Sequence, residues 1–550
     1  MASAANSCLI LVFMYPQEKT CAMRGNCPAR GRFAVSVNHP IGRRLEKPTG
    51  LGHHCAFESE RARRMNDDHI DLLDALRALA FMGDLSMGQP VDHSPRVAWL
   101  ACQLARAIGL NDEVVEGVRC MALLRWSGCT ANATDVAATI SDDVVGRGAM
   151  LALQIERIEV LVSPEELALR MASISAIHCE VSSVIAEALG LGTSVVDALG
   201  CVFEHWDGSG RPLGLSGDSI PISALVVSLC SDFEVLARVH GLPPAFALLQ
   251  KRAGVVYPSA MVAALCARAP AWIDELTQGP AWMNALRAAA PPRAASLALV
   301  GDVIDLQLPW LLGHSRAVAE LADTIGRTLG LAAPTRRTLR RAGWLHGLGR
   351  VAVPNVVWNR AGPFSAADWE RARLSPYWTS RAAHQIGHLE VEAELASHVC
   401  ERLDGSGYFR GSRLAGTPLE FRVLPVASAW LALTARRPWR EALPDDIAIE
   451  HLRKEVVLGR LDGSVVDALA RPTAASQLAA PGGTELRTML SPREIEVLRR
   501  VSLGESNKEV ALRLGISPST VRTHLESIFR KLDCKSRAAG TLKASLLGLL

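Results

Sequence analysis

Apolar residues recur at helical spacing along most of the chain beyond residue 65, whereas alternating apolar and polar runs are scarce. Helical spacing of this kind predicts amphipathic helices rather than strands. Residues 1–65 have no such period and mix Gly, Pro, Arg and Cys, so we expect a disordered tail. The alternative is a translation start at Met65, which directly precedes the first well-formed helical stretch, NDDHIDLLDALRAL. The pattern predicts a mainly α protein.

The clearest helical pattern lies in residues 490–550. A capping box with proline at the first helical position, SPRE at 491–494, begins a helix whose buried face is Ile495, Leu498 and Val501. Gly504 ends this helix, Asn507 is expected to cap a second one, and Gly515 is placed to close it in the left-handed conformation. The apolar residues of the second helix are Val510, Ala511 and Leu514.

A third helix is predicted from Ser517 to Leu532, and it has two distinct faces. Its apolar stripe consists of Val521, Leu525, Ile528, Phe529 and Leu532, and its polar face of Ser519, Arg522, Thr523, Glu526 and Arg530. A tight glycine turn before such a helix is typical of the helix-turn-helix, whose second helix enters the major groove. Residues 490–550 carry a net charge of +5, which suits phosphate contact. An ordinary helical bundle with a solvated charged face is the alternative.

The motifs LSPRE, SNKEVALRLGIS, STVRTHLESIFRKL and the pair Ser536-Arg537 closely resemble the LuxR-type DNA-binding domain. The resemblance implies a four-helix domain that binds double-stranded DNA, and a fourth helix that supports a homodimer through Ala539, Leu542, Leu546 and Leu549. It places Arg522, Thr523 and Glu526 at base edges, although Glu526 can equally be a solvated residue. It assigns phosphate contacts to Asn507, Lys508, Ser519, Thr520, Lys531, Lys535 and Arg537.

The middle of the chain contains an internal repeat. HSPRV at 93–97 parallels HSRAV at 314–318, and EHWDGSG at 204–210 parallels ERLDGSG at 401–407. Asp207 and Asp404 are expected to form turns through bonds from nearby amides. We therefore predict two related helical modules at 66–290 and 296–472, a linker at 473–486, and the DNA-binding domain at 487–550.

Four stretches of the second module resemble the HD-GYP branch of the HD phosphohydrolases: HSRAVAEL, RRAGWLHGLGRVAVPN, ERLDGSGYFRG and RVLPVASAWLALTARRPWREAL. The resemblance implies two HD-type helical domains. Members of this family hold two or three divalent metals with His and Asp side chains. The metals activate a water that attacks a phosphodiester, typically cyclic di-GMP.

Most of the metal-binding positions implied by this resemblance have been replaced. His314 and His346 are retained as vestigial metal-ligand candidates, but Gly347 and Ser428 stand where aspartates are expected. Arg350 replaces a lysine, and Val399-Cys400 replaces a histidine pair, with His398 one residue out of register. In the first module the corresponding positions read Arg125-Trp126 and Val202-Phe203. Two imidazoles without carboxylates give a divalent cation little charge compensation, so we expect no cofactor and no hydrolysis.

The thirteen cysteines are scattered without a C-x-x-C pair, so they are expected to be buried thiols in a reducing cytoplasm. No apolar run is long enough to span a membrane, and the net charge of +3 does not by itself indicate binding to nucleic acid. Three functions stay open: a cytoplasmic transcription regulator whose modules sense a small nucleotide ligand or set dimerisation, a metal-dependent cyclic-dinucleotide phosphodiesterase with a DNA-binding tail, and a protein-binding scaffold.

Overall fold

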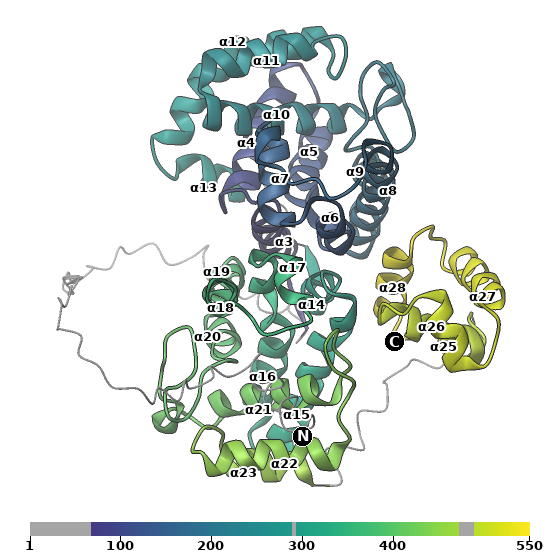
Figure 1. The fold of residues 1–550 in the computed structure, drawn as a ribbon. Coiled ribbons are helices and arrows are strands. Elements are labelled where there is room, and N and C mark those ends of the chain that lie inside the picture. Colours follow the sequence, from purple (N-terminus) through teal and green to yellow (C-terminus); the bar gives the residue numbers. More distant parts are fainter. Residues whose placement is uncertain (1–67, 289–292, 472–488, 550) are drawn as a thin grey trace, which may run out of the picture. The chain divides into compact units, whose positions relative to one another are not determined.

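The computed structural model describes residues 68–288, 293–471 and 489–549. Helices make up nearly all of its regular structure (Figure 1), as the mainly α prediction required. The predicted tail at 1–65 and the predicted linker at 473–486 lie outside the described residues. In the described part of the chain the strands are β1 (His69–Asp71) and β2 (Ala294–Ser296), which pair antiparallel. Each strand leads directly into the first helix of one sequence repeat.

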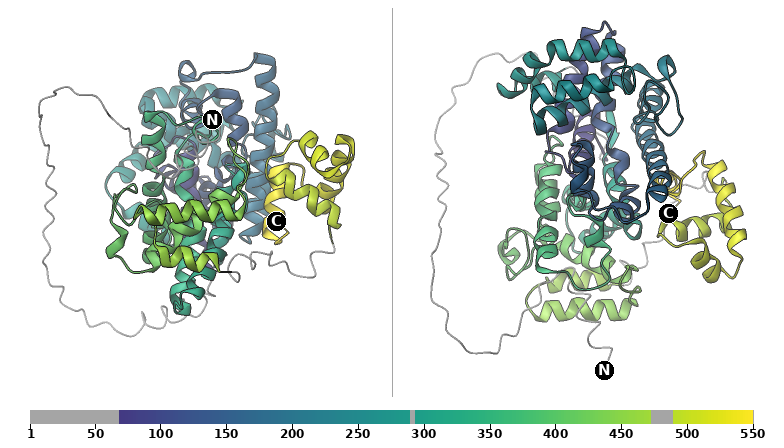
Figure 2. Two further views of the ribbon diagram at one scale, coloured as in Figure 1. Left: turned by 60° about the horizontal axis from the view of Figure 1, so that its bottom comes forward. Right: turned by 45° about the horizontal axis from the view of Figure 1, so that its top comes forward.

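The first repeat is built around α4, α5 and α10, which pack against one another. Among the helices that follow, α8 is the longest, with 25 residues, and Figure 2 shows it from two further sides. The elements of this repeat are β1, α3 (Leu72–Ser86), α4 (His93–Ala107), α5 (Asp112–Leu124), η1 (Ser127–Cys129), α6 (Ala133–Ile140), α7 (Asp143–Leu151), η2 (Ile155–Arg157), α8 (Pro164–Ala188), α9 (Thr193–Leu199), η3 (Gly217–Ser219), α10 (Ile222–His240), α11 (Leu242–Arg252), α12 (Ser259–Thr277) and α13 (Ala281–Ala288).

The second repeat uses α15, α16 and α21 in the same way, with α15 packed against both others. Its elements are β2, α14 (Leu297–Asp305), η4 (Pro309–Leu311), α15 (His314–Thr328), α16 (Ala333–Leu345), η5 (Leu348–Ala352), α17 (Asn355–Trp358), α18 (Ala366–Arg373), α19 (Ser375–Ala383), α20 (Glu390–Ser397), η6 (Leu414–Gly416), α21 (Glu420–Thr434), α22 (Asp445–Val457) and α23 (Gly463–Ala470).

The two repeats share specific hydrogen bonds as well as helix order. Near the start of each repeat, a buried aspartate accepts from the backbone and hydroxyl of a serine, in the pairs Asp84–Ser94 and Asp305–Ser315. Further along, the Gly128 amide donates to Ser182 Oγ at 3.1 Å, and the Gly349 amide donates to Thr379 Oγ1 at 3.0 Å. Both glycines are needed, because a Cβ at either would meet backbone atoms closer than 2.5 Å.

The DGSG turns also match. Asp207 accepts from the Ser209 amide, and Asp404 accepts from the Ser406 amide, both at 2.9 Å. These bonds confirm the turn-forming role predicted for the two aspartates. In each turn region a buried glutamate then accepts from two backbone amides of the following loop: Glu204 from Leu213 and Leu215, and Glu401 from Arg410 and Ser412.

The C-terminal helical domain consists of α25 (Pro492–Ser502), α26 (Asn507–Leu514), α27 (Pro518–Lys531) and α28 (Arg537–Leu546). The capping box at Ser491 and Glu494 is present, and Gly515 closes α26 with a φ of 64°. The cap predicted for α26 was wrong: Ser506, not Asn507, caps this helix. Ser506 is the cap because Glu509 lies three residues after it and its carboxylate accepts from the Ser506 amide, which completes a capping box.

One apolar core holds these four helices together. It contains the predicted apolar faces of α25, α26 and α27, including Leu498, Val510, Val521 and Ile528, all at most 1 % exposed. Ala544 and Leu549 complete the core from the α28 region. Because the apolar stripe of α27 packs into this core, the polar face on the opposite side of the helix lies at the surface.

Candidate DNA-binding surface and remnant histidine sites

The predicted base-reading residues lie together on the exposed face of α27. Arg522, Thr523 and Glu526 are all exposed, and Arg522 Nε donates to Glu526 Oε1 at 2.9 Å. The pair is one helical turn apart, so the carboxylate holds the guanidinium along the helix axis. Because both side chains are more than 60 % exposed, the ion pair itself adds little stability. Its effect is to orient Arg522 on the surface.

A buried carboxylate anchors α27 to α25. Glu494 Oε2 accepts from Lys531 Nζ at 2.7 Å, and Oε1 accepts from Ser527 Oγ at 2.7 Å. Although desolvation opposes it, hydrogen bonding from Lys531, Ser491 and Ser527 lowers the pKa of Glu494 to about 2. Lys531 thus has an intramolecular partner, and the DNA contact predicted for it stays a prediction.

Replacing Glu494 by glutamine is expected to destabilise the C-terminal domain by about 1–2 kcal/mol at pH 7. Since the folded pKa lies below the ordinary value of 4.5, this stabilisation is present above pH 4.5 and is lost as the pH falls towards 2. Thermal unfolding across that range should show wild type and variant converging in acid. Glu496→Gln on the exposed side of α25 is the matched control.

The other predicted DNA contacts fall into two groups. Ser519 and Thr520 point their hydroxyls at Ser517 Oγ, at 2.6 Å and 2.8 Å, so they belong to the α27 cap. Arg537 Nη2 donates to Asn507 Oδ1, and Arg537 Nη1 donates to the Glu505 carbonyl at 3.2 Å, which joins the N-terminal ends of α28 and α26. Two further predicted contacts, Lys508 and Lys535, have exposed side chains.

The apolar face of α28 predicted for dimerisation is largely covered in a single chain. Ala539, Leu542 and Leu549 are at most 3 % exposed, and Leu546 is half-buried. These side chains pack within the chain itself. A homodimer therefore stays a prediction.

In the second repeat His314 and His346 come together as the resemblance implied. Their ring centroids lie 5.4 Å apart, and both side chains are buried. His346 Nδ1 lies 2.6 Å from the Gly343 carbonyl, and its Nε2 lies 2.9 Å from Arg350 Nη2. The arginine can only donate, so His346 Nε2 must be unprotonated and its Nδ1 donates to the carbonyl. Burial and the nearby Arg350 cation lower the pKa of His346 to about 3.

Cations occupy the surroundings of these two imidazoles. Arg350 also lies 3.8 Å from Asp305, and burial raises the pKa of Asp305 to about 7 against the opposing charge of Arg350. Arg437, which the sequence reasoning gave no role, contributes a second cation; burial and Arg350 lower its pKa to about 9. Both cations, together with His346, lower the pKa of His314 further below its ordinary value, which burial already reduces.

The residues present do not fit a divalent metal centre. His346 directs its metal-binding nitrogen at a guanidinium, and the Asp305 carboxyl is taken by Ser315 and Arg350. Within residues 68–288, 293–471 and 489–549, three or more His, Cys, Asp or Glu side chains nowhere converge in the arrangement that a metal ion needs. A metal here would meet two cations and no free carboxylate, which reverses the charge balance such a site requires.

In the first repeat, too, an arginine contacts a buried histidine. Arg125 Nη2 lies 2.6 Å from His93 Nε2, and His93 Nδ1 lies 2.5 Å from Glu234 Oε2. All three side chains are at most 1 % exposed. Glu234 also accepts from Arg96 and Arg238, at 3.0 Å and 3.2 Å. Sequence reasoning missed this network, because Glu234 and His93 are 141 positions apart and no local motif joins them.

Comparison with known proteins agrees with both halves of this description. The family described as HD domain matches residues 158–260 and 298–465, and the family described as bacterial regulatory proteins, luxR family, matches residues 488–544. Among curated proteins, 3'3'-cGAMP-specific phosphodiesterase 3 of Vibrio cholerae serotype O1 is 25 % identical over 410 residues, which cover 66 % of this chain and 87 % of that protein.

Two further relatives match different parts of the chain. The crystal structure of a cyclic GMP-AMP specific phosphodiesterase of Vibrio cholerae, V-cGAP3, matches with a TM-score of 0.53 at 23 % identity, covering 74 % of this chain and 99 % of that chain, which shows the shared fold. The putative HTH-type transcriptional regulator YhjB of Escherichia coli is 42 % identical over 57 residues, 10 % of this chain and 28 % of that protein. The chain therefore combines HD domains with a C-terminal DNA-binding domain of the luxR family of bacterial regulatory proteins.

Proposed function

We propose that the protein is a cytoplasmic transcription regulator that binds double-stranded DNA through α27. The observation that carries the proposal is the exposed face of that helix, where Arg522, Thr523 and Glu526 project from a fully packed four-helix core. The helix begins at a side-chain cap and is fixed to α25 by Glu494, so the polar face is presented on a rigid element. Rigid presentation of a short polar face is what direct readout of base edges requires.

Selection of bound duplexes from a random library by the full-length protein tests this proposal. A single recurring sequence that is protected in footprinting supports it. Equal recovery of all sequences at physiological salt, with binding that disappears at slightly higher salt, would mean that the protein binds only phosphates and would overturn sequence-specific regulation.

The HD domains are proposed to supply the regulatory input, by sensing a small ligand or by setting dimer geometry. We retain the division into modules at 66–290 and 296–472 and a DNA-binding domain at 487–550 as part of this proposal. Sedimentation of the full chain with and without DNA gives its oligomeric state.

Among the described residues every helix is too short or too polar to span a bilayer.

A metal-dependent cyclic-dinucleotide phosphodiesterase is the second candidate, because the relatives that span the middle of the chain carry that activity in their names. The arginines beside His93 and His346 argue against it. We expect the full chain, supplied with Mn²⁺ or Fe²⁺, to leave 3'3'-cGAMP and cyclic di-GMP intact, and His346→Ala to behave as wild type. Metal-dependent hydrolysis that disappears in His346→Ala would establish the enzyme instead.

A further inference from the structure

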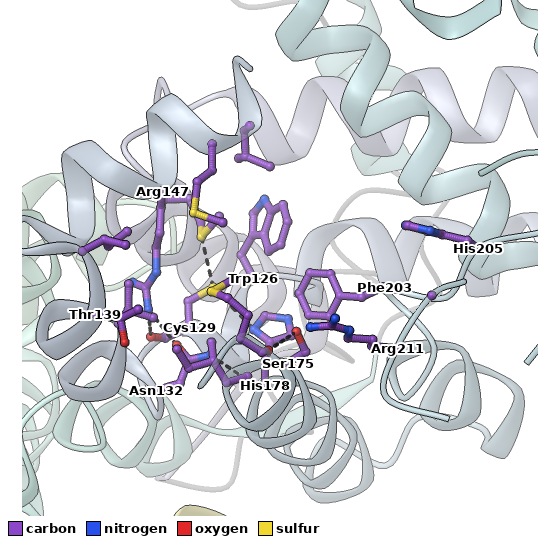
Figure 3. A pocket seen from close by; sticks show the side chains of 18 of the residues that line it. Trp126, Cys129, Asn132, Thr139, Arg147, Ser175, His178, Phe203, His205 and Arg211 are labelled. Atoms are coloured by element: carbon purple, nitrogen blue, oxygen red, sulfur yellow. Dashed lines mark hydrogen bonds between the residues drawn. The ribbon is translucent and has the colours of Figure 1, made fainter. Parts of the chain in front are cut away.

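The first repeat contains a cavity of about 450 Å³ that the DNA-binding proposal does not use. It opens between α6, α7 and α8 and the loop that follows α9 (Figure 3). Its wall is formed mainly by apolar side chains: Met87, Trp126, Val136, Ile140, Met150, Leu151, Met171, Ile174 and Phe203. A cavity of this size and lining is typical of a small-molecule site.

The cavity lies where the HD resemblance places metal ligands. Trp126 stands at the position of an expected aspartate and Phe203 at that of an expected histidine, and both now line the cavity. Together with His178 they form an aromatic cluster, with centroid separations of 5.9 Å for Trp126–His178 and 5.1 Å for His178–Phe203. The substitutions have replaced metal-binding groups by flat apolar surfaces, which favour a planar ligand.

The polar groups of the wall differ in availability. Arg147 is committed to the protein, because it donates to the carbonyls of Ser86 and Cys129 and to Asn132 Oδ1. His178 Nε2 lies 2.7 Å from the Arg125 carbonyl, and burial lowers the pKa of His178 to about 4, so its ring is neutral. The interior of the cavity therefore carries no spare charge for a ligand.

Arg211 is different, because it is exposed and has a single long bond, to the Ala168 carbonyl at 3.3 Å. Figure 3 shows its side chain extending from the loop towards Phe203 at one side of the cavity. The lining contains no Asp or Glu to oppose an anion. One available cation suits one acidic group, whereas the two phosphodiesters of a cyclic dinucleotide would need more.

We propose that this cavity binds a planar, largely apolar molecule with one acidic group, whose body contacts Trp126 and Phe203 and whose acid pairs with Arg211. This inference deepens the proposed function, because it names the ligand class that the first repeat senses. It differs from the substrates that the relatives' names give. Binding itself requires neither DNA nor a metal.

Two fluorescent probes that differ only in the acid provide the test: 8-anilinonaphthalene-1-sulfonate and its uncharged parent, N-phenyl-1-naphthylamine. Both are expected to bind the full chain, the sulfonate more tightly. Ser175→Trp, which fills the cavity from α8, should weaken both probes about tenfold or more, whereas Ala172→Trp on the exposed side of the same helix should not. Met150→Trp fills the cavity from α7 instead, so a loss of binding in both tryptophan variants cannot be ascribed to misfolding of one of them.

Arg211→Gln distinguishes the contribution of the ligand's acidic group to binding from that of its apolar body. It should weaken the sulfonate about fivefold to tenfold and leave the uncharged parent unchanged. Unchanged binding of both probes in Ser175→Trp and Met150→Trp would overturn the site, and equal effects of Arg211→Gln on both would overturn the acidic group. Because these titrations contain no DNA, their failure leaves the DNA-binding proposal standing, and failure to find an operator leaves the cavity site standing.

Discussion

Glu234→Gln is expected to lower the stability of the first repeat by about 3–5 kcal/mol, because it leaves buried cationic partners uncompensated. Glu234 is 1 % exposed and accepts from His93, Arg96 and Arg238. A glutamine keeps the shape but removes the negative charge and turns one acceptor into a donor. The two arginines and the imidazole N–H would then face a group that cannot compensate them.

The midpoint temperature for thermal unfolding of the first repeat should fall by about 10 °C. Amide hydrogen exchange should become faster in α4 and α10. Glu275→Gln, at an exposed position of α12, should leave both measurements unchanged. Desolvation opposes ionisation of Glu234, yet the bonds from His93 and Arg238 hold its pKa below its ordinary value. The contribution is therefore present above pH 4.5 and declines as the pH falls. Unaltered melting of Glu234→Gln would show that the network is not stabilising.

Arg522→Ala is expected to weaken binding to the selected operator by about 1–3 kcal/mol, roughly fivefold to 150-fold, through loss of a contact to a base edge. The side chain is 76 % exposed in the free protein and contributes nothing to the core, so the fold should be unaffected. Mobility-shift titrations on the operator and on a scrambled duplex give the specific and non-specific affinities separately.

Lys508→Ala is the matched control for a phosphate contact, because Lys508 is exposed on the neighbouring helix α26. It should weaken both duplexes alike and reduce the salt slope by about one. If Arg522→Ala behaves in the same way as Lys508→Ala, Arg522 contacts phosphate and the base-reading assignment is wrong. A specific loss with an unchanged salt slope supports base readout.

The C-terminal domain was predictable because its signals are local. The SPRE box, Ser517-Pro518 and Gly515 each determine the conformation of the few residues around them, and each was found as expected. The error at the α26 cap has the same origin. Ser506 and Asn507 are adjacent and both are good caps, and only the reach of Glu509 back to the Ser506 amide decides between them.

The remnant sites were predictable only in part. Motif spacing placed His314 and His346 correctly as neighbours, but it could not show that Arg350 would turn its guanidinium to His346. In the first repeat the sequence showed what was missing at Arg125-Trp126, yet not that Arg125 would bind His93. Such contacts depend on how helices distant in sequence pack and on rotamers that periodicity does not specify. The cavity combines residues from Met87 to Arg211 for the same reason.

In each repeat an arginine contacts a buried histidine, and this contact bears on whether a bound metal ion is needed there. A protein whose fold is completed by a bound ion gains stability in proportion to the logarithm of that ion's free concentration. Arg125 and Arg350 place a covalently attached cation next to His93 and His346. That cation is present in every copy of the chain as soon as it is made. These two positions therefore hold a positive charge at any concentration of free iron or manganese around the chain.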